Sequence, residues 1–443
     1  MDTDRDAVLS ASMNATTRLQ WVASALLAAS VAGIASAVSG QPLQPSAAAR
    51  WVASWTASPQ PTWRSDFAFP TNIPNYLQNQ TVRQVARISL GGARLRLVFS
   101  NAYGQQPLVV GGVSVAITDR GPKIYQQSLR TVKFSGQRSA TISPGAPLLS
   151  DPIDLPVLAL THVTVSAYLP FTTPTTTFHW DGRQTAWITA GDAIAASTLD
   201  TKRGSTQTIT TRTLLAGIEV QRQQPDAQAI AVIGDSTTDG NGATVDADAR
   251  WPDFLAARLA PHGVSVINAG ISGARLLSDK MGVNAVARFE RDVLDQPGVR
   301  TAIVALGIND ISWPGTAFDP GGHQPTLESL ENGFRQLVAQ AHRRNVRVIG
   351  VTLMPFEGAL HGTPLNNYFS AEKEALRQRL NRWIRDGGAF DAVLDFDLLA
   401  KDPKHHLRLN PTIDSGDHLH PGDAGNRVLV NAIPLDLLLP DLI

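Results

Sequence analysis

Residues 50–220 are patterned as short β-strands. Residues 84–90 and 94–99 alternate between apolar and polar positions, and Gly91-Gly92 between them is typical of a β-hairpin turn. Further Val- and Thr-rich runs, separated by Gly, Pro, Asn and Asp turns, lie at residues 109–117, 131–134, 163–169 and 187–189. Because no helical period of useful length interrupts them, the spacing predicts an antiparallel β-sandwich domain with a jelly-roll-like fold.

The pattern changes after the polar stretch 221–228, which we interpret as a linker. From residue 229 to residue 443, short runs that are apolar on both faces alternate with amphipathic stretches, and runs of that kind are typical of a parallel sheet covered by helices. The predicted strands are 229–233, 264–268, 301–306, 346–353 and 392–396, and the predicted helices are 251–259, 285–294, 327–343, 371–385 and 422–438. We expect a doubly wound, flavodoxin-like α/β domain that binds ligands beyond the carboxyl ends of its strands.

Residues 1–49 have the pattern of an export signal followed by a flexible leader. Arg18 precedes an apolar run at 21–38, and Ala35-Ser36-Ala37 offers the small residues that signal peptidase needs. The first dozen residues are acidic, so Met13 is an alternative start that restores a basic beginning. A retained anchor and an alanine-rich tail are the competing interpretations. A cleaved signal predicts a secreted or periplasmic protein without stable membrane insertion, and no later stretch is apolar enough to span a bilayer.

Composition narrows the classes of function. A chain of 443 residues exceeds what one hydrophobic core usually organises, which favours two domains. The absence of cysteine excludes thiolate catalysis, zinc–thiolate sites, iron–sulfur clusters and disulfides. The formal net charge is +0 and basic residues form only short pairs, so no nucleic-acid partner is expected.

The first candidate for chemistry is the segment 234–240, with the sequence GDSTTDG, which directly follows the first predicted parallel strand. Ser236 would lie at the carboxyl edge of the sheet, where backbone N–H groups can stabilise a developing oxyanion. The alternative is a polar turn that caps a helix, because turns favour the same residue types.

The second candidate is Asp417-His418-Leu419-His420, ahead of the last predicted helix. Serine hydrolysis needs a base and a carboxylate that holds the imidazole in one tautomer, and a tight turn lets Asp417 reach His420. A capping Asp with exposed histidines is one alternative, and a weak metal site from His418 and His420 is another. Without cysteine or an HExxH helix, a metal is the least favoured, and no metal or organic cofactor is expected.

Two further segments each follow a predicted strand, at 268–273 (NAGISG) and 307–310 (GIND). Glycine N–H groups and the Asn309 amide are good oxyanion donors because they carry no competing charge. Each segment alone is more often an ordinary turn. A doubly wound sheet, however, brings all four segments to one edge, which favours a shared site.

In this order, the four segments resemble the blocks of SGNH hydrolases, also called GDSL-like esterases, although the first block reads GDST. The resemblance covers about residues 229–443 and implies a three-layer α/β/α domain. It implies Ser236 as nucleophile, His420 as base and Asp417 as the residue that orients His420. It also implies an oxyanion hole formed by the Ser236 N–H, Gly270 and Asn309, with Asp239, Arg250 and Trp251 supporting the nucleophile loop. Residues 50–220 resemble the β-rich domain of exported bacterial members.

The loops that follow the predicted strands, 311–325 with Trp313 and 355–369, mix aromatic, Gly and His residues, which suit a short acyl group, acetyl foremost, on a small molecule or polysaccharide, and we expect Asp235 and Trp313 near the substrate. Export and a β-domain favour sugar esters only by analogy. A long apolar groove near Trp313 and Leu360 would instead favour a lysophospholipase, a thioesterase or a lipase-like enzyme. A non-catalytic carbohydrate-binding protein is the rival from another class. Its stacking faces would be Trp55, Trp63, Trp180 and Trp187, although aromatic residues in sandwiches are more often core.

Overall fold

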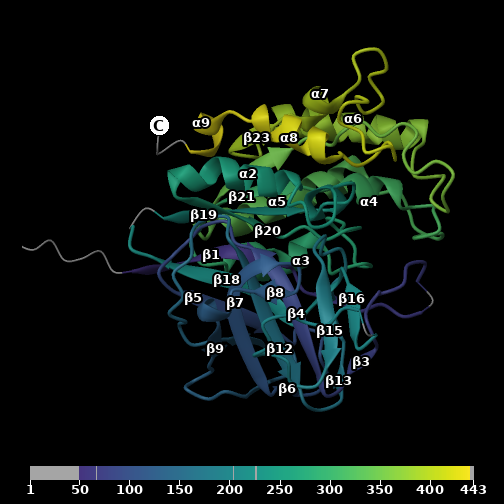
Figure 1. Ribbon diagram of the computed structural model, residues 1–443. Helices are drawn as coiled ribbons and strands as arrows, with labels where there is room; N and C mark the ends of the chain where they lie inside the picture. Colours follow the sequence, from purple (N-terminus) through teal and green to yellow (C-terminus); the bar gives the residue numbers. More distant parts are fainter. Residues whose placement is uncertain (1–48, 66, 203, 225–226, 440–443) are drawn as a thin grey trace, which may run out of the picture. The chain divides into compact units, whose positions relative to one another are not determined.

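Two antiparallel sheets form most of the N-terminal part of the chain (Figure 1). The structure is a computed structural model in which residues 49–65, 67–202, 204–224 and 227–439 are described. The strand order of the first sheet is β1 (Arg50–Thr56), β18 (Leu215–Arg222), β5 (Leu95–Ser100) and β11 (Pro147–Leu149). The order of the second is β16 (Thr206–Ile209), β15 (Ala186–Ala190), β4 (Gln80–Arg87), β12 (His162–Leu169), β7 (Gly112–Arg120) and β8 (Lys123–Ile124), with β9 (Arg130–Val132) also beside β7.

Short strands complete this region, which we call the β-region. β14 (Thr177–His179) lies between β2 (Gln60–Pro61) and β17 (Arg212–Thr213), and the remaining pairs are β3 (Tyr76–Leu77) with β13 (Thr173–Pro174) and β6 (Leu108–Val110) with β10 (Ala140–Ile142). One short 3-10 turn, η1 (Gln126–Ser128), precedes β9. One hydrophobic core joins the two large sheets, since it contains Val82 and Val163 of the second sheet and Leu97 and Ile218 of the first. The β-region therefore has the sandwich character that the sequence predicted.

The hairpin expected at Gly91-Gly92 is not formed. β4 pairs with β12 and β15, whereas β5 pairs with β18 and β11, so the two strands belong to different sheets. The Gly92 N–H donates to the Val157 carbonyl at 3.0 Å, and a Cβ on Gly91 would lie 2.3 Å from the same oxygen. The two glycines allow the backbone to pass close to Val157 where the chain crosses from one sheet to the other. The hairpin prediction was therefore wrong.

A five-stranded parallel sheet organises the C-terminal part, with the order β20 (Val264–Asn268), β19 (Gln228–Gly234), β21 (Val299–Ala305), β22 (Arg347–Val351) and β23 (Ala392–Leu394). The longer helices are α2 (Trp251–Leu259), α5 (Leu327–His342), α6 (Ala371–Asp386) and α8 (Asp423–Asn431). Shorter ones are α1 (Ser236–Asp239), α3 (Ala285–Phe289), α4 (Ile308–Ser312), α7 (Phe396–Ala400) and α9 (Leu435–Leu438), with η2 (Ala260–His262) and η3 (Glu290–Leu294). The helix predicted at 422–438 is two helices, because Pro434 stands between α8 and α9.

Helices cover both faces of the parallel sheet, as predicted. Ile230 and Val232 of β19 share a core with α2, α8 and α9. The alternate residues Ala231 and Ile233 share another core with α3, α5 and α6. Successive side chains of β19 thus point to opposite faces of the sheet, and both faces are buried. The expected three-layer α/β/α arrangement is confirmed.

β1 packs against the C-terminal part as well as within its own sheet. The Ala53 carbonyl accepts a hydrogen bond from Ser265 Oγ at 2.7 Å, and the Ala53 N–H donates to the Pro297 carbonyl at 2.8 Å. The described residues from 49 to 439 belong to one compact unit, and the domain boundary within 221–228 stays a prediction.

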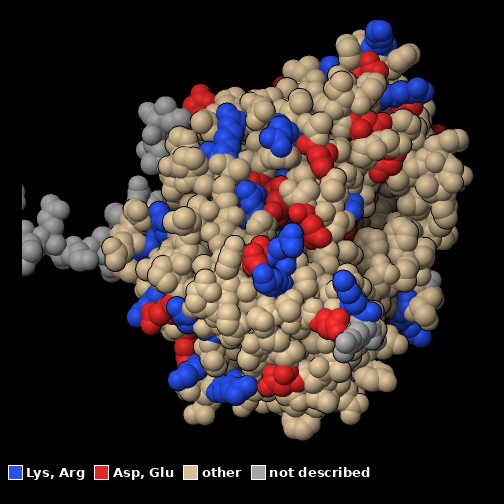
Figure 2. All heavy atoms as spheres, viewed as in Figure 1, with Lys and Arg blue, Asp and Glu red and all other residues tan. Residues whose placement is uncertain are grey.

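The export signal, membrane spans and surface charge were also predicted from the sequence. The signal peptide lies outside the described residues. Across the part of the chain that is described, every helix is too short or too polar to traverse a bilayer. On the face seen in Figure 2, Lys and Arg side chains lie among Asp and Glu side chains, and neither sign gathers into one large patch.

Candidate active site

Ser236 is the first residue of α1, and only Asp235 separates it from the end of β19. The turn forms because Asp235 accepts a hydrogen bond from the Thr237 N–H, and because Gly240 ends the helix at φ 119°, a conformation that favours glycine. A Cβ on Gly234 would lie 2.0 Å from Thr238 Oγ1, so only glycine allows α1 to pack this closely on the strand end. The local sequence thus fixes Ser236 at the carboxyl edge of the sheet.

Ser236, His420 and Asp417 form a continuous hydrogen-bonded chain. Ser236 Oγ lies 2.7 Å from His420 Nε2, and His420 Nδ1 lies 2.6 Å from Asp417 Oδ2. Burial alone would raise the pKa of Asp417, but the hydrogen bonds and charge of His420 hold it well below its usual range. As a carboxylate, Asp417 can only accept from Nδ1–H, which leaves Nε2 of a neutral imidazole free to accept the Ser236 proton. The geometry is that of a general base beside a nucleophile.

His418 points to a different partner. Its Nδ1 lies 2.5 Å from Asp414 Oδ2, and the residue is exposed. The His418 and His420 rings therefore do not face a common site that could bind a metal ion. Within the described ranges, no three His, Cys, Asp or Glu residues are grouped in a way that could hold a metal ion.

A cavity of about 370 Å³ opens in front of Ser236 and His420. Asn309, Asp417 and the expected substrate contact Trp313 also line it. Most of the remaining lining is apolar or aromatic: Phe69, Trp180, Met281, Phe318, Leu360, Leu365 and Tyr368. The space is of the size that holds small organic ligands, and its walls suit an apolar group.

Asn309 presents its amide to this cavity in a defined orientation. Tyr368 Oη lies 2.7 Å from Asn309 Oδ1, and Asn309 Nδ2 donates to the Ala274 carbonyl at 3.0 Å. Because a carbonyl can only accept, Nδ2 must face Ala274 and Oδ1 must face the tyrosine. Burial raises the pKa of Tyr368 well above its usual value, so the hydroxyl keeps its proton and donates. One Nδ2 hydrogen stays available to an oxyanion.

Gly270 is not placed as an oxyanion donor. Its N–H donates to Asn268 Oδ1 at 2.8 Å, and it is not among the residues that line the cavity. A Cβ on Gly270 would lie 2.5 Å from the Asp239 backbone nitrogen, so glycine is needed there for contact with α1. Gly273 lines the cavity instead, and among the described residues its N–H has no hydrogen-bond partner. The candidate donor in this segment is therefore Gly273, and not Gly270, to which the resemblance assigned this role.

Comparison with known proteins identifies the C-terminal part. Residues 232–428 match the model of the GDSL-like lipase/acylhydrolase family. The chain carries a GDSL-like acylhydrolase domain. The match makes this part of the chain an ester-cleaving hydrolase domain, and the predicted SGNH resemblance is confirmed for it.

Several solved structures resemble a part of this chain. An aryl esterase of M. smegmatis is 19% identical, with a TM-score of 0.38 and coverage of 49% of this chain and 100% of that one. A carbohydrate acetylesterase from Sinorhizobium meliloti is 19% identical, with a TM-score of 0.35 and coverage of 46% and 95%. A lipolytic protein of the G-D-S-L family from Desulfitobacterium hafniense is 18% identical, with a TM-score of 0.34 and coverage of 46% and 96%. At these values the likeness says nothing about this chain's substrate, and no curated protein matches the chain.

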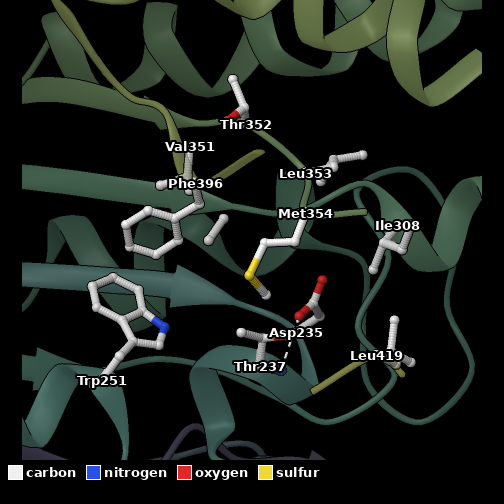
Figure 3. A pocket seen from close by; sticks show the side chains of 11 residues that line it. Asp235, Thr237, Trp251, Ile308, Val351, Thr352, Leu353, Met354, Phe396 and Leu419 are labelled. Atoms are coloured by element: carbon white, nitrogen blue, oxygen red, sulfur yellow. Dashed lines mark hydrogen bonds between the residues drawn. The ribbon is translucent and has the colours of Figure 1, made fainter. Parts of the chain in front are cut away.

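Asp235 was expected near the substrate but lies behind the nucleophile turn of the acylhydrolase domain. It lines a separate cavity of about 40 Å³ together with Trp251, Met354 and Leu419 (Figure 3). Burial raises the pKa of Asp235 to about 7, against the hydrogen bond from the Thr237 N–H. Asp235 caps α1 and is absent from the lining of the large cavity, so the substrate-contact expectation is not met.

The β-region contributes to the site in a way that the sequence did not reveal. Phe69 and Trp180 line the large cavity beside Ser236. Trp55 and Trp187, by contrast, are buried in the β-region, as is usual for aromatic residues in sandwiches. No sequence signal separates Trp180 from the other tryptophans, because its place depends on contacts between distant parts of the chain.

Proposed function

We propose that this protein is a serine ester hydrolase in which Ser236 is the nucleophile, His420 the base and Asp417 the residue that orients His420. The hydrogen-bonded chain from Ser236 Oγ through His420 to Asp417 carries the proposal. The oxyanion donors in this proposal are the N–H groups of Ser236 and Gly273 and the Nδ2–H of Asn309. All three residues line one cavity.

The reaction proceeds in two halves. Ser236 Oγ attacks the ester carbonyl carbon while His420 Nε2 takes the hydroxyl proton, and the carbonyl electron pair moves to the oxygen held by the three donors. The tetrahedral adduct collapses, the C–O bond to the alcohol breaks, and His420 returns its proton to the alcohol. Water then attacks acyl-Ser236 with His420 again as base, which releases the acid and restores the serine.

The cavity favours an ester with an apolar group larger than acetyl. Phe69, Trp180, Trp313 and Phe318 surround the space of about 370 Å³, and an acetyl group would leave most of this apolar surface without contact. We therefore propose medium-chain acyl or aromatic esters as the substrate class, which is nearer to the lipase-like alternative than to the acetyl esters favoured by the sequence.

A sugar ester is the second candidate because a polar cavity of about 420 Å³ shares Phe69 with the first. Its lining includes Thr62, Arg64, Asn75 and Thr175, which suit a hydroxyl-rich alcohol. In this alternative the acyl group occupies the apolar cavity and the sugar occupies the polar one.

A fluorophosphonate that carries an alkyl chain tests the nucleophile directly. We expect stoichiometric loss of activity, and peptide mass spectrometry should find the adduct on Ser236. The Ser236→Ala variant should remain unlabelled, and Ser415→Ala, which changes a serine near the final turn, should label like the wild type. Labelling of another serine with equal loss of activity would contradict the assignment.

We also propose that the signal peptide within residues 1–49 directs export and is removed, and that the rest of this segment stays as a leader. The small residues Ala35-Ser36-Ala37 support cleavage after Ala37. N-terminal sequencing of the protein recovered from the periplasm or medium should begin near residue 38, and an intact N-terminus on cytoplasmic protein would contradict export.

A further inference from the structure

One segment of the β-region, from His179 to Arg183, contacts the end of α1, the helix that begins with Ser236. In this segment, His179 Nε2 lies 2.9 Å from Asp239 Oδ1 of α1, and the Arg183 side chain donates to the Gly240 carbonyl at 2.9 Å. Trp180, between them, lines the catalytic cavity. None of these contacts can be predicted from the sequence pattern, since His179 and Asp239 are 60 residues apart.

His179 is buried, and both of its ring nitrogens have defined partners. Nδ1 lies 3.1 Å from the Ser58 carbonyl, which can only accept, so Nδ1 carries a hydrogen. Nε2 faces the Asp239 carboxyl group. Burial lowers the pKa of His179, but the charge of Asp239 and the hydrogen bond between them outweigh it, so the net shift is upward. This shift favours the protonated ring, which donates from Nε2 to the Asp239 carboxylate in the contact between β14 and α1.

The second carboxylate oxygen of Asp239 extends this series of hydrogen bonds toward the cavity. Asp239 Oδ2 accepts the Ser272 N–H at 2.7 Å, and both groups are buried. The next residue is Gly273, whose N–H is the candidate oxyanion donor. A shift of the Asp239 carboxylate would therefore move the peptide that precedes this donor.

We propose that His179 is a positioning residue for the oxyanion hole: through Asp239 it holds the Ser272 N–H, and thereby the adjoining peptide that carries the Gly273 N–H. The β-region would then complete the catalytic site of the acylhydrolase domain. The proposal rests on the proposed serine-hydrolase function. It explains why a buried charged pair lies at this contact, since a displacement of about 1 Å at a catalytic group can cost about a hundredfold in rate.

The test compares His179→Ala, His179→Gln and wild type in hydrolysis of p-nitrophenyl butyrate and in inactivation by diethyl p-nitrophenyl phosphate. The phosphoryl oxygen of this inhibitor needs the same donors as the oxyanion. For His179→Ala we expect kcat and the inactivation rate to fall about 10- to 100-fold, with KM within about twofold of wild type. Gln can still donate to Asp239, so His179→Gln should recover most of both rates.

His162→Ala is the matched control. His162 also belongs to the β-region and bonds an aspartate of the C-terminal part, with 2.6 Å between Nε2 and Asp248 Oδ2, but that pair has no link to the cavity. We expect His162→Ala to keep wild-type kcat. If His179→Ala and His179→Gln both fold and kcat stays at the wild-type value, the proposal is overturned. Equal losses in His179→Gln and His179→Ala would also overturn it.

A failure of the underlying function is distinguishable from a failure of this inference. If Ser236→Ala keeps the butyrate activity of the wild type, the serine mechanism fails whatever the His179 variants do. If Ser236→Ala is inactive and His179→Ala is fully active, only the positioning role fails. Should His179→Ala not fold, His179→Asn takes its place, because the shorter amide does not reach Asp239, and thermal unfolding confirms the fold of each variant that is compared.

Discussion

Tyr368 Oη donates a hydrogen bond of 2.7 Å to Asn309 Oδ1, and this bond determines which end of the amide faces the oxyanion position. Without the hydroxyl, only the Ala274 carbonyl would favour the productive orientation. The Tyr368 side chain is fully buried against Phe356, so its removal is not a surface change. Tyr368 is thus expected to affect the rate through Asn309.

The Tyr368→Phe variant should lower kcat about tenfold, less than loss of an entire oxyanion donor, while KM changes little. In an Asn309→Ala background, the same substitution should have no further effect, because no amide remains to be oriented. A double-mutant cycle on kcat measures this coupling. Additive losses would mean that Tyr368 acts independently of Asn309.

Asn309→Ala alone should lower kcat about a hundred- to a thousandfold, the usual cost of one oxyanion donor. Asn332→Ala on the outer surface of α5 is the matched control and should be neutral. Steady-state kinetics on one p-nitrophenyl ester measures both variants, and an Asn309→Ala enzyme with wild-type kcat would remove Asn309 from the oxyanion hole.

Gly270→Ala should destabilise the protein, because the new Cβ would lie 2.5 Å from the Asp239 backbone nitrogen and the α1 backbone would have to shift. Overpacking of this kind typically costs about 1–3 kcal/mol. Thermal unfolding of Gly270→Ala should therefore show a lower Tm. Gly321→Ala is the control, since a Cβ there meets nothing within 4 Å, and an equal Tm for both variants would refute the close-approach explanation.

Phe69→Ala and Trp180→Ala should shift the preference of the enzyme toward longer acyl chains, because each removes a wall of the catalytic cavity. The measurement is kcat/KM over p-nitrophenyl esters from acetate to palmitate. Phe171→Ala, whose side chain is exposed outside the cavity, should keep the wild-type profile. An unchanged profile in both cavity variants would mean that the acyl group binds elsewhere.

Asp235→Asn should stabilise the protein more at about pH 8 than at about pH 4.5. The folded pKa of Asp235 is about 7 and its ordinary value is 3.8, so the folded state holds a proton that the unfolded state releases. This contribution to stability is complete below the ordinary pKa and is lost as the pH rises to the folded one. Asparagine keeps the cap on α1 without titrating. A gain in Tm that is independent of pH would contradict the raised pKa.

Strand and helix positions could be predicted because they depend on local periodicity. Residues 264–268 and 251–259 were predicted with the bounds that β20 and α2 have. The partner of a strand is not a local property, and so Gly91-Gly92 was misinterpreted as a hairpin turn although β4 and β5 belong to different sheets.

The same division applies to the site. Four site residues could be located from the sequence, because each follows a predicted strand or precedes a predicted helix and carries a hydroxyl, amide, carboxylate or imidazole group. They are Ser236, Asn309, Asp417 and His420. The choice between Gly270 and Gly273 required the direction of individual N–H groups. His179 and Trp180 required long-range packing of the β-region, which leaves no periodic signal in the sequence.

The most direct test of the central claim is hydrolysis of a p-nitrophenyl ester series by the wild type and Ser236→Ala side by side. The account predicts activity that is highest on medium acyl chains and falls to the uncatalysed level in Ser236→Ala. Wild-type activity retained in Ser236→Ala would contradict it.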